Sequence, residues 1–277
     1  MPSRVTIGAY RAASLLLSQE TLVRSPAFRW LYFKYKRFVA DPFARLPAYL
    51  PNIYSGGFII DVGANIGYTS SVFQRYVDEE RAIFAFEPES NNFSVLESLA
   101  KSWRNVECLQ MAVGDACGEL TLRRNPVHPG DHKVARGSNP RKDESLQPTE
   151  RCSCTTLDAF LLSRGIEPSD VRFLKIDVQG FEPAVLSGAH ALLQSARHLS
   201  IALEFDAPAI EAMGFRPQHL LDELRNFGFT AHRLHNSGML EPLPAITPST
   251  TCDILCLREE FFGNHKKRSS SDVGVAR

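Results

Sequence analysis

The sequence has 277 residues, of which 44% are hydrophobic and 22% are charged. This composition is typical of a globular protein, and the length fits one large α/β domain with additions better than two small domains. Lys plus Arg and Asp plus Glu both total 31, so the formal net charge is zero. Because a neutral chain has no bulk attraction to a polyanion, we expect no nucleic-acid partner.

Six cysteines are present, and their spacing does not match the usual zinc motifs. One residue separates Cys152 from Cys154, and three separate Cys252 from Cys256. The apolar run at residues 15–17 is too short for the core of a secretory signal peptide. We therefore expect reduced thiols, no metal and a cytoplasmic location.

Residues 1–56 precede the first buried strand and are predicted to form a helical N-terminal extension. Within it, residues 28–39 place aromatic and aliphatic side chains on one helical face, with Arg29 and Lys36 on another. The pattern favours a helix that packs over the core. The alternative is a peripheral contact of this helix with a membrane surface. The apolar stretch is shorter than the roughly 20 residues that a spanning helix needs.

Residues 58–69 read FIIDVGANIGYT, which predicts a buried strand, a tight turn and the start of a helix reaching about residue 77. The turn departs from the dinucleotide motif G-x-G-x-x-G, because Asn65 and Tyr68 replace two of its small residues. Asp61 would repel a pyrophosphate but suits a cationic ligand. S-adenosylmethionine carries an ammonium and a sulfonium group, so the turn favours this methyl donor over NAD.

Two further strands are predicted to lead into acidic residues. Residues 82–86 are followed by Glu87, where a carboxylate can accept hydrogen bonds from ribose hydroxyls or, alternatively, cap the next helix. Residues 106–113 lead to Asp115, which can accept a hydrogen bond from an adenine amino group or merely shape a turn with Gly114. Ligands of open parallel sheets bind beyond the carboxyl ends of the strands, so we expect both carboxylates at one site.

Residues 124–151 interrupt the pattern with four prolines, many polar residues and few apolar ones. An insertion of this length is usually either functional or disordered. We expect either a lid over the cofactor, with His128, His132, Lys133 and Arg136 near the substrate, or a mobile loop.

The candidate catalytic residues follow the next two strands, predicted at residues 171–176 and 199–205. Lys175 and Asp177 share one face of the first strand, because side chains alternate along it. Asp177 is the first candidate for the base that a hydroxyl acceptor needs, and Glu204 is the second. Lys175 is expected to be an ion-pair partner, since an amine stays protonated at neutral pH.

The alternative role of these carboxylates is to bind a magnesium ion. Asp177 with Glu204 or Asp206 could hold it, and the ion would lower the pKa of an acceptor hydroxyl. Acidic residues near one sheet edge are common without a metal, so the metal-free interpretation is preferred.

Taken in order, these motifs resemble the FkbM-type methyltransferase domain. The likeness covers roughly residues 57–235 and departs from the family pattern at Gln179, where the pattern usually has Glu. The stretches that carry it are residues 58–67, 86–88, 112–115, 156–158, 174–182 and 185–189.

The resemblance implies a doubly wound, Rossmann-like sheet of seven strands in three α/β/α layers, placed at residues 57–262 before a tail predicted to be disordered at 263–277. It also implies an S-adenosylmethionine-dependent enzyme that methylates a hydroxyl of a sugar, glycolipid or natural product. By this likeness Glu87 would hold the ribose and Asp115 the adenine, with Asp177 beside the cofactor. The methionine part would be held by the turn residues Asp61, Gly63, Ala64, Asn65 and Gly67. An NAD-dependent oxidoreductase and a non-catalytic binding module with the same fold are the alternatives.

Overall fold

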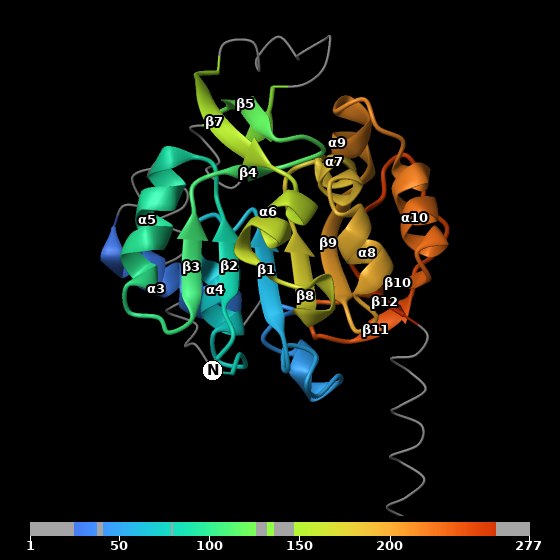
Figure 1. Ribbon diagram of the computed structural model, residues 1–277, viewed down its shortest axis with the longest axis horizontal. Coiled ribbons are helices and arrows are strands. Elements are labelled where there is room, and N and C mark those ends of the chain that lie inside the picture. The colour runs from blue at the N-terminus through green and yellow to red at the C-terminus, as the bar shows by residue number, and fades with distance from the viewer. Residues whose placement is uncertain (1–24, 38–40, 79, 126–131, 136–146, 259–277) are drawn as a thin grey trace, which may run out of the picture.

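The computed structural model describes residues 25–37, 41–78, 80–125, 132–135 and 147–258. Its larger sheet has eight strands in the order β11-β10-β12-β9-β8-β1-β2-β3 (Figure 1). The strands are β1 Phe58–Val62, β2 Ile83–Phe86, β3 Val106–Leu109, β8 Val171–Ile176, β9 Ser200–Asp206, β10 Phe229–Leu234, β11 Leu240–Pro242 and β12 Thr251–Arg258.

Five of these strands, from β3 to β9, run parallel, and β12, β10 and β11 are each antiparallel to their neighbours. The chain begins in the middle of the sheet at β1, continues outward to β3, and then returns to β8 on the other side of β1. This reversal is the topological switch point at which doubly wound sheets bind ligands. The seven expected strands are therefore present, and the short β11 adds an eighth at the edge.

Helices cover both faces of the sheet and complete the three expected layers. In Figure 1, α6, α8 and α10 lie on the near face, and α3 and α4 lie on the far face. The helices are α3 Pro26–Tyr35, α4 Tyr68–Phe73, α5 Ser90–Ala100, α6 Leu157–Arg164, α7 Glu182–Ser187, α8 His190–Ser195, α9 Ala207–Ala212 and α10 Pro217–Asn226, with 3-10 turns η2 Leu46–Ala48 and η4 Pro168–Asp170.

The core is divided between the two faces by the alternation of side chains along each strand. In β1, Ile60 and Val62 pack into the larger cluster with residues of α6, α8 and α10. Ile59 packs into the second cluster with Tyr54 and Phe73 on the opposite face. The strands near the centre are buried along almost their whole length, as expected for parallel strands covered on both sides.

A second, four-stranded sheet lies above the carboxyl ends of the parallel strands (Figure 1). It has the order β4-β7-β5-β6 and consists of β4 Ala112–Val113, β5 Gly118–Arg123, β6 Lys133–Val134 and β7 Thr149–Thr155. The prediction of one continuous strand over residues 106–113 was therefore wrong. The amide of Met111 donates to the carbonyl of Leu109 at 2.9 Å, and after this turn β4 pairs with β7 rather than with β2.

Two predicted helices are shorter than expected. α4 ends at Phe73 rather than near residue 77, and the expected helix between the turn at Gly180 and about Leu193 is divided into α7 and α8 at Gly188. A Cβ atom at Gly188 would lie 2.0 Å from the carbonyl oxygen of Gly114. The missing side chain of Gly188 therefore allows the segment after β4 to approach this helix pair closely.

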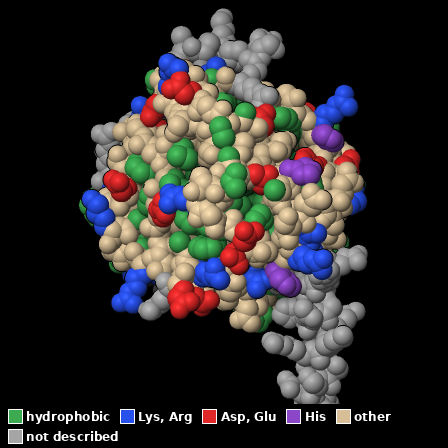
Figure 2. Space-filling view, viewed as in Figure 1, with side chains coloured by type: hydrophobic (Ala, Val, Ile, Leu, Met, Phe, Trp, Pro, Cys, Tyr) green, Lys and Arg blue, Asp and Glu red, His purple; other side chains and the backbone are tan. Residues whose placement is uncertain are grey.

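Several predictions fall partly or wholly outside the described residues. In the predicted insertion, residues 132–135 contain β6 and residues 149–151 begin β7, but His128 and Arg136 lie outside the described residues. The same holds for residues 1–24 and for the tail at 263–277. Figure 2 shows charged side chains of both signs spread around the near face. None of the helices described is both long enough and apolar enough to cross a membrane.

Candidate active site

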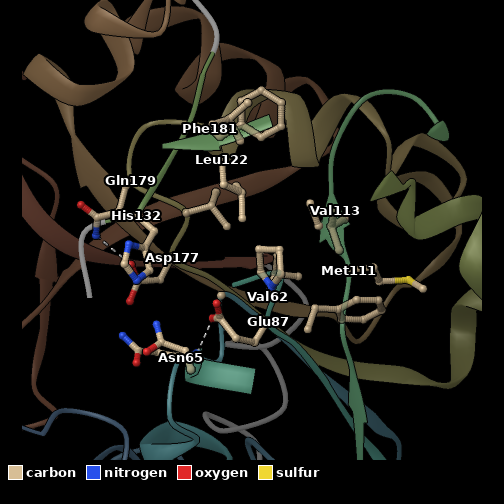
Figure 3. Close-up of a pocket in the computed structure, with 17 residues that line it drawn as sticks. Val62, Asn65, Glu87, Met111, Val113, Leu122, His132, Asp177, Gln179 and Phe181 are labelled. Atoms are coloured by element: carbon tan, nitrogen blue, oxygen red, sulfur yellow. Dashed lines mark hydrogen bonds between the residues drawn. The ribbon is translucent and has the colours of Figure 1, made fainter. Parts of the chain in front are cut away.

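A cavity enclosing about 660 Å³, part of it open to solvent, lies where the ends of β1, β2 and β8 meet the second sheet (Figure 3). The turn after β1 contributes Gly63 and Asn65, the end of β2 contributes Glu87, and the loop after β8 contributes Asp177 and Gln179. The cavity thus lies at the switch point of the sheet, where open α/β sheets bind ligands. The second sheet and its flanking segments contribute a largely apolar side, which includes Met111, Val113, Leu122, His132, Val134 and Phe181.

The turn after β1 has an unusual backbone that only certain residues can adopt. Gly63, Asn65 and Gly67 have φ values of 76°, 52° and 84°, a region that glycine and asparagine tolerate best. The amides of Gly63 and Ala64 donate to the carbonyl of Phe86 at 3.0 and 2.9 Å. The amide of Asn65 therefore faces the end of β2, where it donates to Glu87.

Glu87 is the buried carboxylate at the floor of the cavity, with only 5% of its surface exposed. Its two oxygens accept from the amides of Asn65 at 2.8 Å and Glu89 at 2.9 Å. Burial raises the pKa of Glu87 to about 7, although these hydrogen bonds oppose the shift. Each carboxylate oxygen has a second lone pair, so Glu87 can still accept hydrogen bonds from ligand hydroxyls.

The cavity combines one buried carboxylate with an apolar wall. The Glu87 carboxylate can accept hydrogen bonds from hydroxyl groups, and Met111, Val113 and Phe181 contribute apolar surface (Figure 3). Asp115 is exposed and is not among the residues lining the cavity. Its carboxylate lies beyond Val113, at the turn that leads to β5.

Asp61 lies behind the turn rather than in the cavity. It is fully buried, and its carboxylate pairs with Lys175 Nζ at 3.2 Å and accepts from Ser70 Oγ at 2.6 Å. The expectation that Asp61 is free to face a cationic ligand is therefore wrong, because Lys175 already neutralises it. Ala64 and Gly67 also do not line the cavity. These three residues shape the turn from behind.

Lys175 connects the turn after β1 with the loop after β8. Its Nζ donates to the carbonyl of Gly63 at 2.8 Å and lies 3.5 Å from Asp177 Oδ2. Burial opposes the charge of the ammonium, yet Asp61 and Asp177 hold the pKa of Lys175 above its ordinary value. The prediction that Lys175 is an ion-pair partner is thus confirmed.

Asp177 and Glu204 are joined by Gln179. The side-chain amide of Gln179 donates to Glu204 Oε2 at 2.9 Å and to Asp177 Oδ1 at 3.3 Å. Asp177 lines the cavity and its side chain is 41% exposed, whereas Glu204 stands behind it, outside the lining. Burial, followed by the charges of Asp177 and Asp253, raises the pKa of Glu204 to about 8.

Two charged residues near this pair were not identified from the sequence. Asp253 in β12 stands directly opposite Glu204 in β9, and burial raises the pKa of Asp253 to about 6. Lys36, just after α3, interacts electrostatically with Asp177 and Asp253; burial opposes its charge, but its pKa is raised by Tyr32 and these two carboxylates. Asp253 could have been found in the sequence, because it is a charged residue within the otherwise largely apolar last strand.

His132 and Val134 of the insertion both line the cavity (Figure 3). In His132 the two ring nitrogens have different neighbours. Its Nδ1 accepts from the amide of Asn125 at 2.9 Å, and its Nε2 lies 3.9 Å from Glu89. Glu89 caps the start of α5 through the amide of Asn92 at 2.8 Å and pairs with Arg124 at 2.8 Å. The neutral imidazole that this arrangement favours carries its proton on Nε2.

Within the described residues, no three His, Cys, Asp or Glu side chains are grouped so that they could hold a metal ion. Asp206, which the magnesium alternative used, instead caps α9 by accepting from the amide of Ala209 at 3.2 Å.

Comparisons with known proteins agree on one class of enzyme. Residues 61–231 match the family model described as the methyltransferase FkbM domain. The methyltransferase sdnD of Sordaria araneosa is 28% identical over 211 residues, which cover 66% of this chain and 78% of that protein.

Solved structures with similarity to this chain include two methyltransferases. One is an S-adenosylmethionine-dependent O-methyltransferase from Thermotoga maritima, at 16% identity and a TM-score of 0.43, covering 86% of this chain and 71% of that one. The other, from Geobacter sulfurreducens, has 15% identity and a TM-score of 0.42, with 93% and 98% covered.

The family match extends over more than half of the chain and decides against the NAD-dependent oxidoreductase. The cavity at the switch point, with its ribose-compatible carboxylate and apolar wall, fits the cofactor of such an enzyme. The chain therefore belongs to the FkbM methyltransferase domain family and is an S-adenosylmethionine-dependent methyltransferase.

Proposed function

We propose that this methyltransferase transfers the methyl group to a hydroxyl of a sugar, glycolipid or natural product. The observation that carries the proposal is the carboxylate of Asp177 at the cavity, which Gln179 joins to Glu204 behind it. S-adenosylmethionine supplies an activated methyl group on a sulfonium, so the protein has to position the acceptor and remove its proton. A hydroxyl acceptor needs such a base, because its O–H bond breaks as the O–CH₃ bond forms.

Asp177 is the group placed to take the proton. It lines the cavity, and Lys175 fixes one of its oxygens while Gln179 donates to the other. Burial raises the pKa of Glu204 to about 8, which lies in the range where a carboxyl group can both take up and release a proton near neutral pH. The proposed path therefore runs from the acceptor hydroxyl to Asp177, with Glu204 sharing the proton.

The cofactor contacts are assigned by the position of each residue around the cavity. Glu87 would hold the ribose, and Met111, Val113 and Phe181 would enclose the adenine. The turn at Gly63 would hold the methionine part, with Asn65. Asp61, Ala64 and Gly67 would support that turn from behind. The proposed role for the exposed Asp115 is to shape its turn with Gly114.

Three proposals concern the surroundings of the enzyme. The insertion acts as a lid, which the position of His132 at the cavity supports. The location is cytoplasmic and the acceptor is not a nucleic acid, which is supported by six free cysteines and a net charge of zero. Residues 28–39 pack over the core, which is supported by the ring contacts of Tyr32 and Phe33 with Tyr68, and a membrane contact of their exposed side is the alternative; Phe38 and Val39 lie outside the described residues.

Labelling with tritiated methyl donor tests the class of acceptor. The purified protein is incubated with donor and a lysate extract, and the product is then treated with mild alkali. A methyl ether keeps its label, a methyl ester loses it as volatile methanol, and a methylamine gains basic character. We expect alkali-stable, uncharged product with the wild type and little with Asp177→Asn. Label in an ester or amine would contradict the proposal, and labelling that never depends on the protein would support the non-catalytic module.

A further inference from the structure

Helix α3 is a surface helix with an unusual composition. Residues 25–37 contain five aromatic and four basic residues and no acidic one. None of the ten residues of the helix is fully buried. Its contact with the rest of the protein includes the rings of Tyr32 and Phe33, whose centroids lie 6.3 and 5.3 Å from that of Tyr68. The helix therefore packs on Tyr68 of α4 through these two rings, while Trp30 remains an exposed aromatic residue.

An open groove of about 1160 Å³ runs between α3, α4 and the end of α5. Its wall is mainly apolar, and Trp30, Phe33, Val72, Leu99 and Trp103 contribute to it. Trp30 is 59% exposed. A contiguous apolar surface of this kind usually marks an interaction site.

The charges at the groove all have one sign. Arg29, Lys34, Arg37 and Arg75 line it, and none of the described residues lining it is acidic. Lys34 Nζ lies 3.9 Å from the centre of the Trp30 ring, so positive charge and apolar surface meet at the same place. A binding partner that complements this surface has both apolar groups and negative charges.

We propose that this groove docks the protein onto a membrane surface that contains anionic lipids. Tryptophan beside basic side chains is the composition of helices that lie in the headgroup region, where the ring reaches the acyl boundary and the cations meet lipid phosphates. A nucleic acid would bind better to a row of basic side chains without the apolar wall. An acidic protein surface would contact the basic side chains but would leave the apolar wall exposed to water. This surface is separate from the carboxyl pair, so the docking does not depend on the identity of the methyl acceptor.

The two tryptophans of the chain allow binding at the groove to be followed by fluorescence. Trp30 and Trp103 both line it, and the chain has two tryptophans in total. The intrinsic tryptophan fluorescence of the full chain therefore reports from this groove. We expect a blue shift on mixing with vesicles of phosphatidylcholine and phosphatidylserine, a much smaller one with phosphatidylcholine alone, and loss of the shift at high salt.

Co-sedimentation with the same vesicles tests the named residues. The variant Lys34→Gln/Arg37→Gln should bind the mixed vesicles more weakly, by roughly fivefold for each charge removed, and Trp30→Ala should weaken binding further. Arg225→Gln removes an exposed charge from α10 and should bind like the wild type. Thermal unfolding and affinity for S-adenosylmethionine should be unchanged in all of these variants.

Two results would overturn the proposal. The first is absence of vesicle binding by the full chain, which would mean that the groove is covered by a protein partner or by another part of the chain. The second is equal binding by wild type and groove variants, which would place the lipid contact elsewhere. Either result would leave the methyl-transfer proposal intact, because the labelling experiment with a soluble extract does not use this surface.

Discussion

Gly63 lies against the backbone of Asp177, so closely that a Cβ atom on Gly63 would be 1.9 Å from the carbonyl oxygen of Asp177. The turn after β1 and the loop after β8 therefore meet backbone to backbone, with Lys175 bonded to the same turn. The turn that lines the cavity and the first candidate base are thus joined by direct backbone contact.

Gly63→Ala should disrupt this junction. A side chain at a φ of 76° is strained, and the contact with Asp177 forces the two loops apart. We expect a loss of about 2 kcal/mol or more in the free energy of unfolding, measured in urea, and at least a tenfold loss of cofactor affinity by calorimetry. Gly165→Ala is the matched control, because Gly165 has a φ of 62° but a Cβ atom there would meet nothing within 4 Å. Equal effects of the two substitutions would show that the close contact is unimportant.

Glu87 should make cofactor affinity depend on pH. Its pKa of about 7 lies above the ordinary value of 4.5, so the group gains its negative charge as the pH rises through about 7. Because ribose hydroxyls donate best to a carboxylate, affinity for S-adenosylmethionine should rise between about pH 6 and pH 8. In Glu87→Gln this rise should disappear, with affinity at pH 8 lower by roughly 10- to 100-fold. A variant that keeps the pH dependence would assign it to another group.

Asp177→Asn and Glu204→Gln should separate catalysis from cofactor binding. We expect Asp177→Asn to lower kcat by roughly 10²- to 10⁴-fold, while affinity for S-adenosylmethionine changes little. In the wild type, kcat should rise with pH through about 8, as the carboxyl of Glu204 loses its proton. Glu204→Gln should remove that rise. Glu211→Gln, an exposed position on α9, serves as the control. Unchanged turnover in Asp177→Asn would disprove the assigned base.

The buried pair of Asp61 and Lys175 should contribute strongly to stability. Lys175→Met leaves the fully buried Asp61 without its cation, and such a loss costs about 3–5 kcal/mol. The double variant Lys175→Met/Asp61→Asn removes both charges and should recover part of this loss. A double-mutant cycle in urea measures the coupling. Additive effects would mean that the two groups do not interact.

Local sequence patterns were sufficient for most of the larger sheet and for part of the site. Apolar runs ending at Val62, Phe86 and Ile176 predicted the buried strands, and the small-residue turn predicted after the first of them lies beside the cavity. Glu87, Asn65 and Gly63 line that cavity because the end of a parallel strand always opens at the same edge of the sheet.

The second sheet could not be predicted in the same way. The residues of β4 continue the apolar pattern of β3, and only the pairing of Ala112 with Cys154, 42 positions later in the chain, separates the two strands. Pairing between distant segments depends on how the whole chain packs, so a periodic pattern cannot reveal it.

The sequence by itself determined which segments form buried strands, where the turn with positive φ angles lies, and which strands are followed by a carboxylate. Each of these features depends on residues that are neighbours in the chain. Only the tertiary structure decided which charges meet. The register between β1 and β8 pairs Asp61 with Lys175, and the register between β9 and β12 places Asp253 beside Glu204. The interaction energy of two charges depends on the distance between them, and for charges on different strands the fold of the whole chain sets that distance.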